Sequence, residues 1–290
     1  MSKILITGAT GNLGKSVIQN LLKAIKPENL AVLGRNAEKL ENLKIVGVDV
    51  RIGDYNDYDS LLQAFQGIDK LYFVSGNDMV NRLKQHENVV NAAKVAGVKH
   101  IVYTSFLCEN ETKTSPISFI TEDHIITENW LKASGMKYTI LKHNLYMDML
   151  PIFIGEKVLE TETIYLPAGE GKAAFTLRED LAEVAAQILT TEGHENKEYD
   201  LTADKAYSYD EIATIISNIS GKAIRYYSPS KEEFTKTLTE AGVPGEYIEL
   251  FVGFSLAIGE GELNKTNSLI EQLIGRKPTS VEECLQEVYS

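Results

Sequence analysis

The chain has 290 residues, of which 43% are hydrophobic and 24% charged, a composition that is ordinary for a globular protein with a sizeable core. Acidic residues outnumber basic ones by 41 to 29, and the formal charge of -12 argues against a general nucleic-acid binder, because phosphate affinity comes mainly from Lys and Arg. No apolar run reaches the about 20 residues that span a bilayer. The start, Met1-Ser2-Lys3, lacks a signal-peptide layout, so we expect a cytoplasmic protein with no membrane partner.

The first half of the chain alternates short apolar runs with segments of helical period. Parallel strands need helical crossovers, and strands that are buried on both faces read as continuous apolar runs. The pattern therefore predicts an α/β fold, a Rossmann-type doubly wound parallel sheet, within residues 1–150. The expected strands are 3–7, 30–33, 45–48, 70–74, 100–104 and 137–141, and the expected helices are 12–25, 37–43, 57–65, 82–96 and 117–133.

The pattern changes after about residue 145. Residues 151–290 are expected to form a smaller, mostly helical C-terminal part, some segments of which return to the Rossmann core. We interpret this part as substrate-binding. The expected strands are 164–166 and 198–201, and the expected helices are 178–190, 209–220, 231–241, 247–258 and 281–288.

A glycine-rich loop joins the first expected strand to the first expected helix. Gly8 permits the sharp turn out of the strand, Gly11 lets a pyrophosphate approach the backbone, and Gly14 lets the helix pack close to the sheet. The helix amides and dipole then face the phosphates. This placement predicts a dinucleotide site, with a ligand-free glycine turn as the alternative. The loop residues assigned to the cofactor are Gly8, Thr10, Gly11, Asn12 and Leu13.

The end of the second expected strand indicates which dinucleotide is bound. NAD-binding proteins usually carry Asp or Glu there, which accepts hydrogen bonds from the ribose. This chain instead reads Gly34-Arg35-Asn36. Because a guanidinium offers a charged fork to phosphate oxygens, Arg35 favours the 2′-phosphate of NADP(H). The alternative is an ordinary surface arginine.

Polar residues follow three further expected strands. Asp54-Tyr55 follows the third, Ser75-Gly76 the fourth and Thr104-Ser105 the fifth. Ligands of open α/β sheets bind beyond the carboxyl ends of the strands. We therefore expect these residues to trace the path of the cofactor, with Asp54 and Tyr55 beside the adenine.

Four further segments add to the motifs above: 85–93, 96–105, 190–197 and 273–275. Together these motifs resemble the atypical short-chain dehydrogenases of the NmrA-like family. The likeness spans nearly the whole chain, and the glycine loop is its least specific part. It implies NADPH-dependent reduction of quinones or bulky, dye-like conjugated acceptors, with the C-terminal half forming the substrate cleft. Our expectation for the assembly is a monomer or homodimer. The segments that carry the resemblance are 8–14, 34–36, 53–55, 85–93, 96–105, 190–197 and 273–275.

One segment departs from the family pattern. Relatives commonly carry Leu-Arg-Asn where this chain reads Leu141-Lys142-His143. The resemblance places this segment near the nicotinamide, so we assign His143 and Asn144 to the cofactor and Tyr146 to the substrate. His143 puts the substrate range of the family in doubt for this protein.

A catalytic tyrosine–lysine pair is not expected. Typical short-chain dehydrogenases use Tyr-x-x-x-Lys, whose spacing places both side chains on one helix face. Tyr138 and Lys142 have this spacing but fall in an expected strand, where they are about 13 Å apart. Tyr227 and Lys231 flank a proline. Such a pair would be expected on the helix over 117–133, which offers His124 instead.

His124 is our candidate catalytic residue, because an imidazole can donate a proton or orient an acceptor near neutral pH. The alternative is a histidine at the surface or cap of its helix. Hydride transfer needs no protein nucleophile, so the missing pair does not exclude a reductase. It does argue against an epimerase or dehydratase.

A non-catalytic NADP(H)-sensing regulatory protein is the competing function. A regulator of that kind is expected to carry a partner-binding appendage, and the sequence shows none. Metal chemistry is not expected. Cys108 and Cys284 lie far apart, so a Cys-rich site is excluded and a disulfide is possible but disfavoured. His86, His100 and His194 are scattered without metal-ligand spacing.

Overall fold

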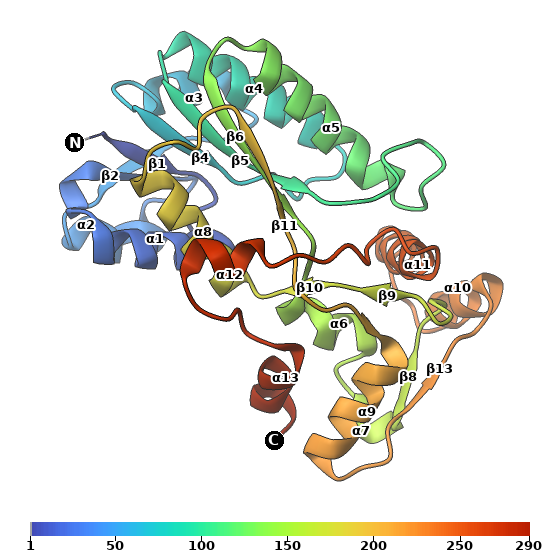
Figure 1. Ribbon diagram of the computed structural model, residues 1–290. Coiled ribbons are helices and arrows are strands. Elements are labelled where there is room, and N and C mark those ends of the chain that lie inside the picture. Colours follow the sequence, from blue (N-terminus) through green and yellow to red (C-terminus); the bar gives the residue numbers. More distant parts are fainter. Residues whose placement is uncertain (1) are drawn as a thin grey trace. The chain divides into compact units, whose positions relative to one another are not determined.

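The computed structural model describes residues 2–290 (Figure 1). Met1, at which the expected first domain begins, lies outside the described residues. The chain folds into two compact units. The first contains the chain up to Phe106, then Glu122–His143 and Arg178–Asp200, and the second contains Leu107–Thr121, Asn144–Leu177 and Leu201–Ser290.

A seven-stranded sheet in the order β3-β2-β1-β4-β5-β6-β11 forms the centre of the first unit. The strands from β1 to β6 pair in parallel, which confirms the predicted Rossmann-type sheet. Because the strand order reverses at β1, the carboxyl ends of β1 and β4 are neighbours at the switch point where such sheets bind ligands. The strands are β1 (Ile4–Ile6), β2 (Leu30–Gly34), β3 (Asp49–Ile52), β4 (Lys70–Phe73), β5 (His100–Phe106), β6 (Lys137–His143) and β11 (Lys197–Leu201).

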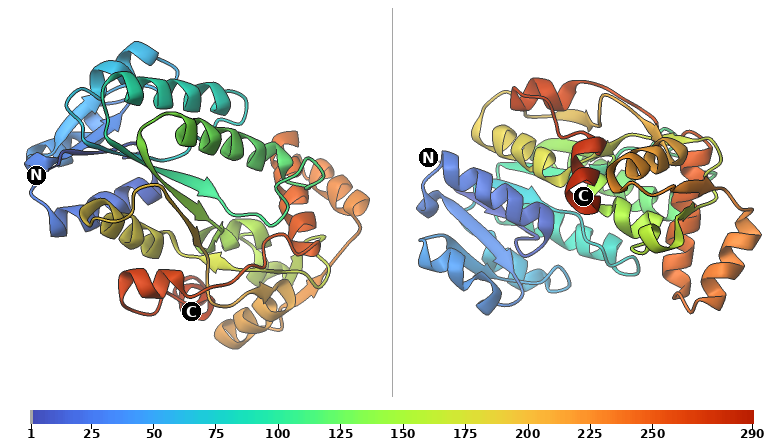
Figure 2. Two further views of the ribbon diagram at one scale, coloured as in Figure 1. Left: turned by 45° about the horizontal axis from the view of Figure 1, so that its top comes forward. Right: turned by 90° about the horizontal axis from the view of Figure 1, so that it is seen from below.

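Helices cover both faces of this sheet (Figures 1 and 2). α3, α4 and α5 lie on one face, and α1 and α8 pack together on the other. The apolar residues of α1 recur at helical spacing and are buried, so the helix turns one stripe toward the sheet. The helical segments are α1 (Asn12–Ala24), η1 (Pro27–Asn29), η2 (Glu38–Leu40), α2 (Glu41–Ile45), α3 (Tyr58–Ala64), α4 (Arg82–Val95), α5 (Ser118–Ala133) and α8 (Arg178–Thr190).

The predicted bounds of the third strand, 45–48, are wrong. Ile45 and Val46 are 73% and 54% exposed at the end of α2, and the chain turns at Gly47, whose φ is +93°. The strand begins only at Asp49, whose carboxylate lies 2.7 Å from the ammonium of Lys3. β3 is an edge strand, so it tolerates polar residues that an apolar pattern does not reveal.

Helices predominate over short strands in the second unit. Its three strand pairs are β7–β10, β9–β12 and β8–β13. Within residues 2–290 no helix has the length and hydropathy needed to cross a membrane. The elements are β7 (Leu145–Tyr146), η3 (Met147–Met149), α6 (Leu150–Ile154), α7 (Val158–Thr161), β8 (Thr163–Tyr165), β9 (Lys172–Ala173), β10 (Phe175–Thr176), β12 (Tyr207–Ser208), α9 (Tyr209–Ser220), β13 (Arg225–Tyr227), α10 (Lys231–Glu240), α11 (Gly245–Gly259), α12 (Leu269–Ile274) and α13 (Val281–Tyr289).

Candidate functional site

The three glycines of the β1–α1 loop occupy three different environments. Gly8 has a φ of +61°, which L side chains rarely adopt. A Cβ on Gly14 would lie 2.2 Å from the carbonyl oxygen of Gly8, so only glycine permits this packing of α1 on the turn. A Cβ on Gly11 would meet only that same oxygen, at 3.4 Å, and otherwise project into open space. The open surface at Gly11 fits the approach of a pyrophosphate.

The N-terminus of α1 is suited to an anion. Its cap residue, Gly11, makes no side-chain capping hydrogen bond, and the first turn contains no acidic residue. The first N–H groups of a helix have no intrahelical acceptor, so they are available to phosphate oxygens. Thr10 and Asn12 are exposed beside them. Leu13 is buried, so any contact with a cofactor would come from its backbone amide.

Thr7, for which the sequence alone predicts no role in the site, connects the ends of β1 and β4. Its hydroxyl oxygen accepts from the backbone N–H of Val74 over 2.9 Å, and the hydroxyl of Tyr55 lies 2.5 Å from it. The Tyr55 hydroxyl also donates to the carbonyl of Val74 at 2.8 Å. Burial raises the pKa of Tyr55, so it stays a neutral phenol. The sequence feature that could have indicated this role is a polar residue at the end of a buried, apolar strand.

Asp54 and Tyr55, which we expect beside the adenine, make hydrogen bonds that hold the loop after β3. The carboxylate of Asp54 accepts from the backbone N–H of Asn56 at 2.9 Å, and its own backbone N–H donates to Ser60 Oγ at 3.1 Å. The carbonyl of Tyr55 accepts from the side-chain amide of Asn88. Contact of Asp54 or Tyr55 with a cofactor stays a prediction.

Arg35 directly follows β2 and is exposed. It forms no ion pair among the residues that the structure describes. Gly34 before it is tightly packed, because a Cβ there would lie 2.6 Å from Cδ1 of Leu40. The guanidinium therefore follows a rigid strand end and has no acidic partner within residues 2–290, which fits a 2′-phosphate.

The loop after β4 is fixed by hydrogen bonds from its backbone. The N–H of Ser75 donates to Thr104 Oγ1 at 2.8 Å, and the N–H of Gly76 donates to Nε2 of His86 at 3.0 Å. A Cβ on Gly76 would lie 2.9 Å from the side-chain oxygen of Gln85, so the loop lies close against α4. His86 is fully buried here.

Ser105 is directed toward α5. Its hydroxyl donates to the buried carboxylate of Glu128 at 2.5 Å, and that carboxylate lies 3.4 Å from the ammonium of Lys142. Lys142 on β6 therefore forms an ion pair with Glu128 on α5. Tyr138 lies on the same strand as Lys142. Neither Thr104 nor Ser105 is exposed, so both have internal roles alongside the predicted contact with the cofactor.

His124 is buried, so the alternative of a surface histidine is wrong. Its Nδ1 lies 2.7 Å from the hydroxyl of Tyr103, and its ring is 6.3 Å from that of Phe106. Burial, followed by the charge of Arg82, holds the pKa of His124 well below 6.5. The residue is therefore a neutral imidazole near neutral pH.

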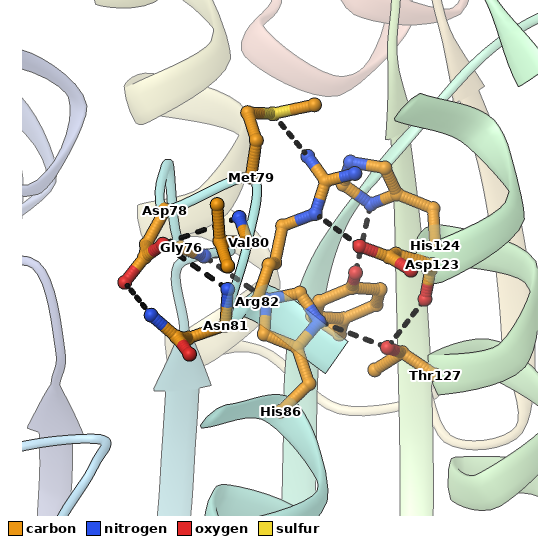
Figure 3. Close-up of polar contacts among 11 residues, drawn as sticks. Gly76, Asp78, Met79, Val80, Asn81, Arg82, His86, Asp123, His124 and Thr127 are labelled. Atoms are coloured by element: carbon orange, nitrogen blue, oxygen red, sulfur yellow. Dashed lines mark hydrogen bonds and ion pairs between the residues drawn. The ribbon is translucent and has the colours of Figure 1, made fainter. Parts of the chain in front are cut away.

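Arg82 is the buried first residue of α4. Its Nε donates to the carboxylate of Asp123 at 3.0 Å, and Nη1 lies 3.5 Å from the sulfur of Met79. Asp78 braces the preceding turn by accepting from the backbone and side chain of Asn81. These contacts fix the residue before His124 against the start of α4 (Figure 3).

The segment after β6 contains the residues that depart from the family pattern. His143 is 1% exposed, and burial lowers its pKa from 6.5 to about 3. The side-chain amide of Asn144 donates to Thr202 Oγ1 and to the carbonyl of Leu263, both at 3.2 Å. Asn144 therefore organises the second unit. Tyr146 is half-buried on β7.

Neither cysteine forms a disulfide, and no group of three potential metal ligands occurs within residues 2–290. Cys108 contacts a buried carboxylate of the second unit. Its sulfur lies 3.3 Å from Oε2 of Glu262, which also accepts from Ser115 Oγ at 2.6 Å. Asn110 donates to the other carboxylate oxygen at 2.8 Å. Burial raises the pKa of the Cys108 thiol to about 12.

Known proteins resemble this chain over its whole length. It is 34% identical to quinone oxidoreductase 2 of Escherichia coli (strain K12), with 99% of each chain covered. The structure of Citrobacter sp. triphenylmethane reductase complexed with NADP(H) superposes with a TM-score of 0.90 at 39% identity, covering 98% of this chain and 99% of that one. The Escherichia coli NADPH-dependent quinone oxidoreductase complexed with NADPH gives a TM-score of 0.92 at 35% identity, covering 99% and 100%. The model of the NmrA-like family matches residues 1–285, and the chain therefore belongs to that family.

Proposed function

We propose that the protein is an NADPH-dependent oxidoreductase that transfers a hydride to quinones or similar conjugated, dye-like acceptors. The observation that carries this proposal is the full-length likeness to two reductases that were crystallised with NADPH or NADP(H). Two features of the first unit support the same cofactor. The N-terminus of α1 has no side-chain cap, and Arg35 forms no ion pair among the described residues.

The first unit contains the residues that would hold the cofactor. The backbone amides at Gly11 and Asn12 would donate to the pyrophosphate, and Arg35 would bind the 2′-phosphate. Thr7, which precedes the glycine loop, is hydrogen-bonded to Tyr55 and to the backbone of Val74. NADPH supplies the hydride when it is bound, and the protein positions the acceptor.

His124 is proposed to orient the acceptor through a hydrogen bond. Its lowered pKa disfavours storage of a proton as imidazolium at neutral pH. Reduction of a quinone to a hydroquinone consumes one hydride and one proton, and water can supply the proton. The second unit, including Tyr146, is proposed to bind the acceptor. The monomeric or homodimeric state and the cytoplasmic location stay predictions.

A panel of acceptors tests this proposal. Purified protein would receive NADPH with benzoquinone, a naphthoquinone or a triphenylmethane dye, while absorbance of the reduced cofactor is followed. We expect NADPH oxidation with at least one acceptor and one reduced product per NADPH. Tight NADPH binding without turnover on any acceptor would reject the reductase and favour the regulatory alternative.

A further inference from the structure

His86 lies in a directional chain of hydrogen bonds between two loops of the site. The backbone N–H of Gly76 donates to Nε2, so this nitrogen carries no hydrogen and the proton of the neutral ring lies on Nδ1. Nδ1 therefore donates to Thr127 Oγ1, which lies 2.9 Å away. The Thr127 hydroxyl in turn donates to the carbonyl of Asp123 at 2.7 Å. The chain begins at the N–H of Gly76, which can only donate, and ends at the carbonyl of Asp123, which can only accept (Figure 3). These two ends fix the direction of the hydrogen bond between His86 and Thr127.

The ring of His86 is held in this orientation by its surroundings. It is fully buried, and it makes edge contacts with Phe73 at 4.9 Å and with Tyr103 at 5.7 Å between ring centroids. Burial and then the charge of Arg82 lower its pKa from 6.5 to about 3, so the neutral tautomer persists over the usual working range. A protonated ring would lose its acceptor for the Gly76 amide.

The two ends of the chain belong to different halves of the proposed reaction. Gly76 lies beyond the carboxyl end of β4, next to the switch point of the sheet, where the cofactor is expected. Asp123 lies on α5 directly before His124, the residue proposed to orient the acceptor. His86 itself lies on α4 and is connected to both.

We infer that His86 is a positioning residue that couples the cofactor loop at Gly76 to the acceptor-orienting helix at Asp123 and His124. Imidazole suits this role because it accepts at one nitrogen and donates at the other in a fixed geometry. The glutamine amide has the same pair of functions, whereas phenylalanine has the ring and neither function. The inference rests on the proposed reductase function.

Two variants that break the hydrogen-bond chain at different residues separate the two effects. His86→Phe removes both hydrogen bonds and leaves the Gly76 amide without its acceptor, so we expect the Kd for NADPH to rise about tenfold and kcat with benzoquinone to fall about tenfold. Thr127→Val keeps the hydrogen bond between Gly76 and His86 and removes the α5 hydroxyl that contacts His86 and the carbonyl of Asp123. It should therefore leave the Kd for NADPH within about twofold of wild type and lower kcat about tenfold. His86→Gln should keep both the Kd for NADPH and kcat within about threefold of the wild-type values.

His100 provides a matched control. It is also buried and contacts a threonine hydroxyl, that of Thr139 at 2.8 Å, but it begins β5 at the opposite end of the strand from Thr104. His100→Phe should change thermal stability without changing the Kd for NADPH or kcat. Thermal denaturation of each variant without cofactor checks that it folds. If His86→Phe does not fold, the contrast between Thr127→Val and His86→Gln tests the same coupling.

Two results would overturn the inference. One is a folded His86→Phe protein with wild-type Kd and kcat. The other is a Thr127→Val protein that weakens NADPH binding as much as it slows turnover. Wild-type protein that binds NADPH but reduces no acceptor would instead refute the proposed function. The NADPH-binding measurements on His86→Phe and His86→Gln would still test the cofactor end of the chain.

Discussion

The phenol oxygen of Tyr55 lies 2.5 Å from the side-chain oxygen of Thr7, although the two residues are 48 positions apart in the chain. Thr7 precedes the glycine loop, and its oxygen also accepts from the backbone N–H of Val74 at the end of β4. The base of the proposed phosphate site is thus held by three loops, which follow β1, β3 and β4.

Removing the Tyr55 hydroxyl should loosen this base. For Tyr55→Phe we expect the Kd for NADPH to rise about threefold to tenfold and the free energy of unfolding to fall by about 1 kcal/mol, the typical contribution of one internal hydrogen bond. Fluorescence titration and urea denaturation measure the two quantities. Tyr58, in the first turn of α3, makes no side-chain hydrogen bond among the described residues, so Tyr58→Phe should bind NADPH as wild type does. Unchanged binding by Tyr55→Phe would contradict the bracing role.

Two glycine substitutions should separate folding from cofactor binding. Gly11→Ala meets only the Gly8 carbonyl, at 3.4 Å, so the protein should fold normally. The added methyl group would occupy the space proposed for the pyrophosphate, so the Kd for NADPH should rise more than about tenfold. In Gly14→Ala the Cβ would lie 2.2 Å from the same carbonyl, so the melting temperature should fall as well. Normal NADPH binding by Gly11→Ala would show that the phosphates lie elsewhere.

Buried histidines predict how stability depends on pH. Burial lowers the pKa of His86 and His143 from 6.5 to about 3, and that of His100 to about 4. Below pH 6.5 the unfolded chain binds protons that the folded protein does not. The stability that comes from keeping these histidines neutral is therefore fully present above pH 6.5, and it is lost as the pH falls toward the lowered pKa values.

Each of these histidines should contribute a slope of about 1.4 kcal/mol per pH unit well below pH 6.5. Urea denaturation between pH 7.5 and pH 5 measures the sum. His100→Gln should reduce the slope by about one such increment. A free energy of unfolding that does not change over this range would contradict the buried, neutral state of these rings.

The carboxylate of Glu262 should protect the Cys108 thiol. It accepts hydrogen bonds from Ser115 and Asn110 in the segment after β5, and it lies 3.3 Å from the Cys108 sulfur. Because burial raises the pKa of Cys108 to about 12, iodoacetamide should label it slowly at pH 8. Glu262→Ala should lower stability by about 3 kcal/mol, the order expected when a buried polar network is broken, and should accelerate the labelling. Peptide mass spectrometry separates this site from Cys284, and rapid labelling of Cys108 in wild type would contradict the prediction.

Much of the fold could be predicted because its signals are local. Apolar periodicity placed α1 and α4 within a residue or two of their observed bounds, and it failed at β3, where an edge position allows Asp49 in the strand. The signal of the glycine loop was also local, since three glycines at a fixed spacing, Gly8, Gly11 and Gly14, define it. The polar contacts that organise the site were not predictable in the same way. Thr7 meets Tyr55, and His86 meets Thr127 from 41 positions away, only because the order and register of the sheet bring them together.

His124 illustrates the same limit. Its position on the helix after β5 followed from the chain order of the elements, but its burial did not. The local sequence would be the same for a histidine at the surface and for one held against Tyr103, so it does not predict whether the side chain is buried. The difference between a proton donor and a neutral hydrogen-bonding group depends on the side chains that β5 and α4 place around the ring.

The most direct test of the account is the ratio of kcat/KM for NADPH to that for NADH in benzoquinone reduction, measured for wild type and Arg35→Ala. A charged hydrogen bond to the 2′-phosphate should favour NADPH by roughly tenfold to a hundredfold in wild type. The ratio should fall toward one in Arg35→Ala, while Lys39→Ala, which removes an exposed charge nearby, should preserve it. Equal use of the two cofactors by the wild-type protein, or oxidation of neither, would contradict the proposed NADPH-dependent reduction.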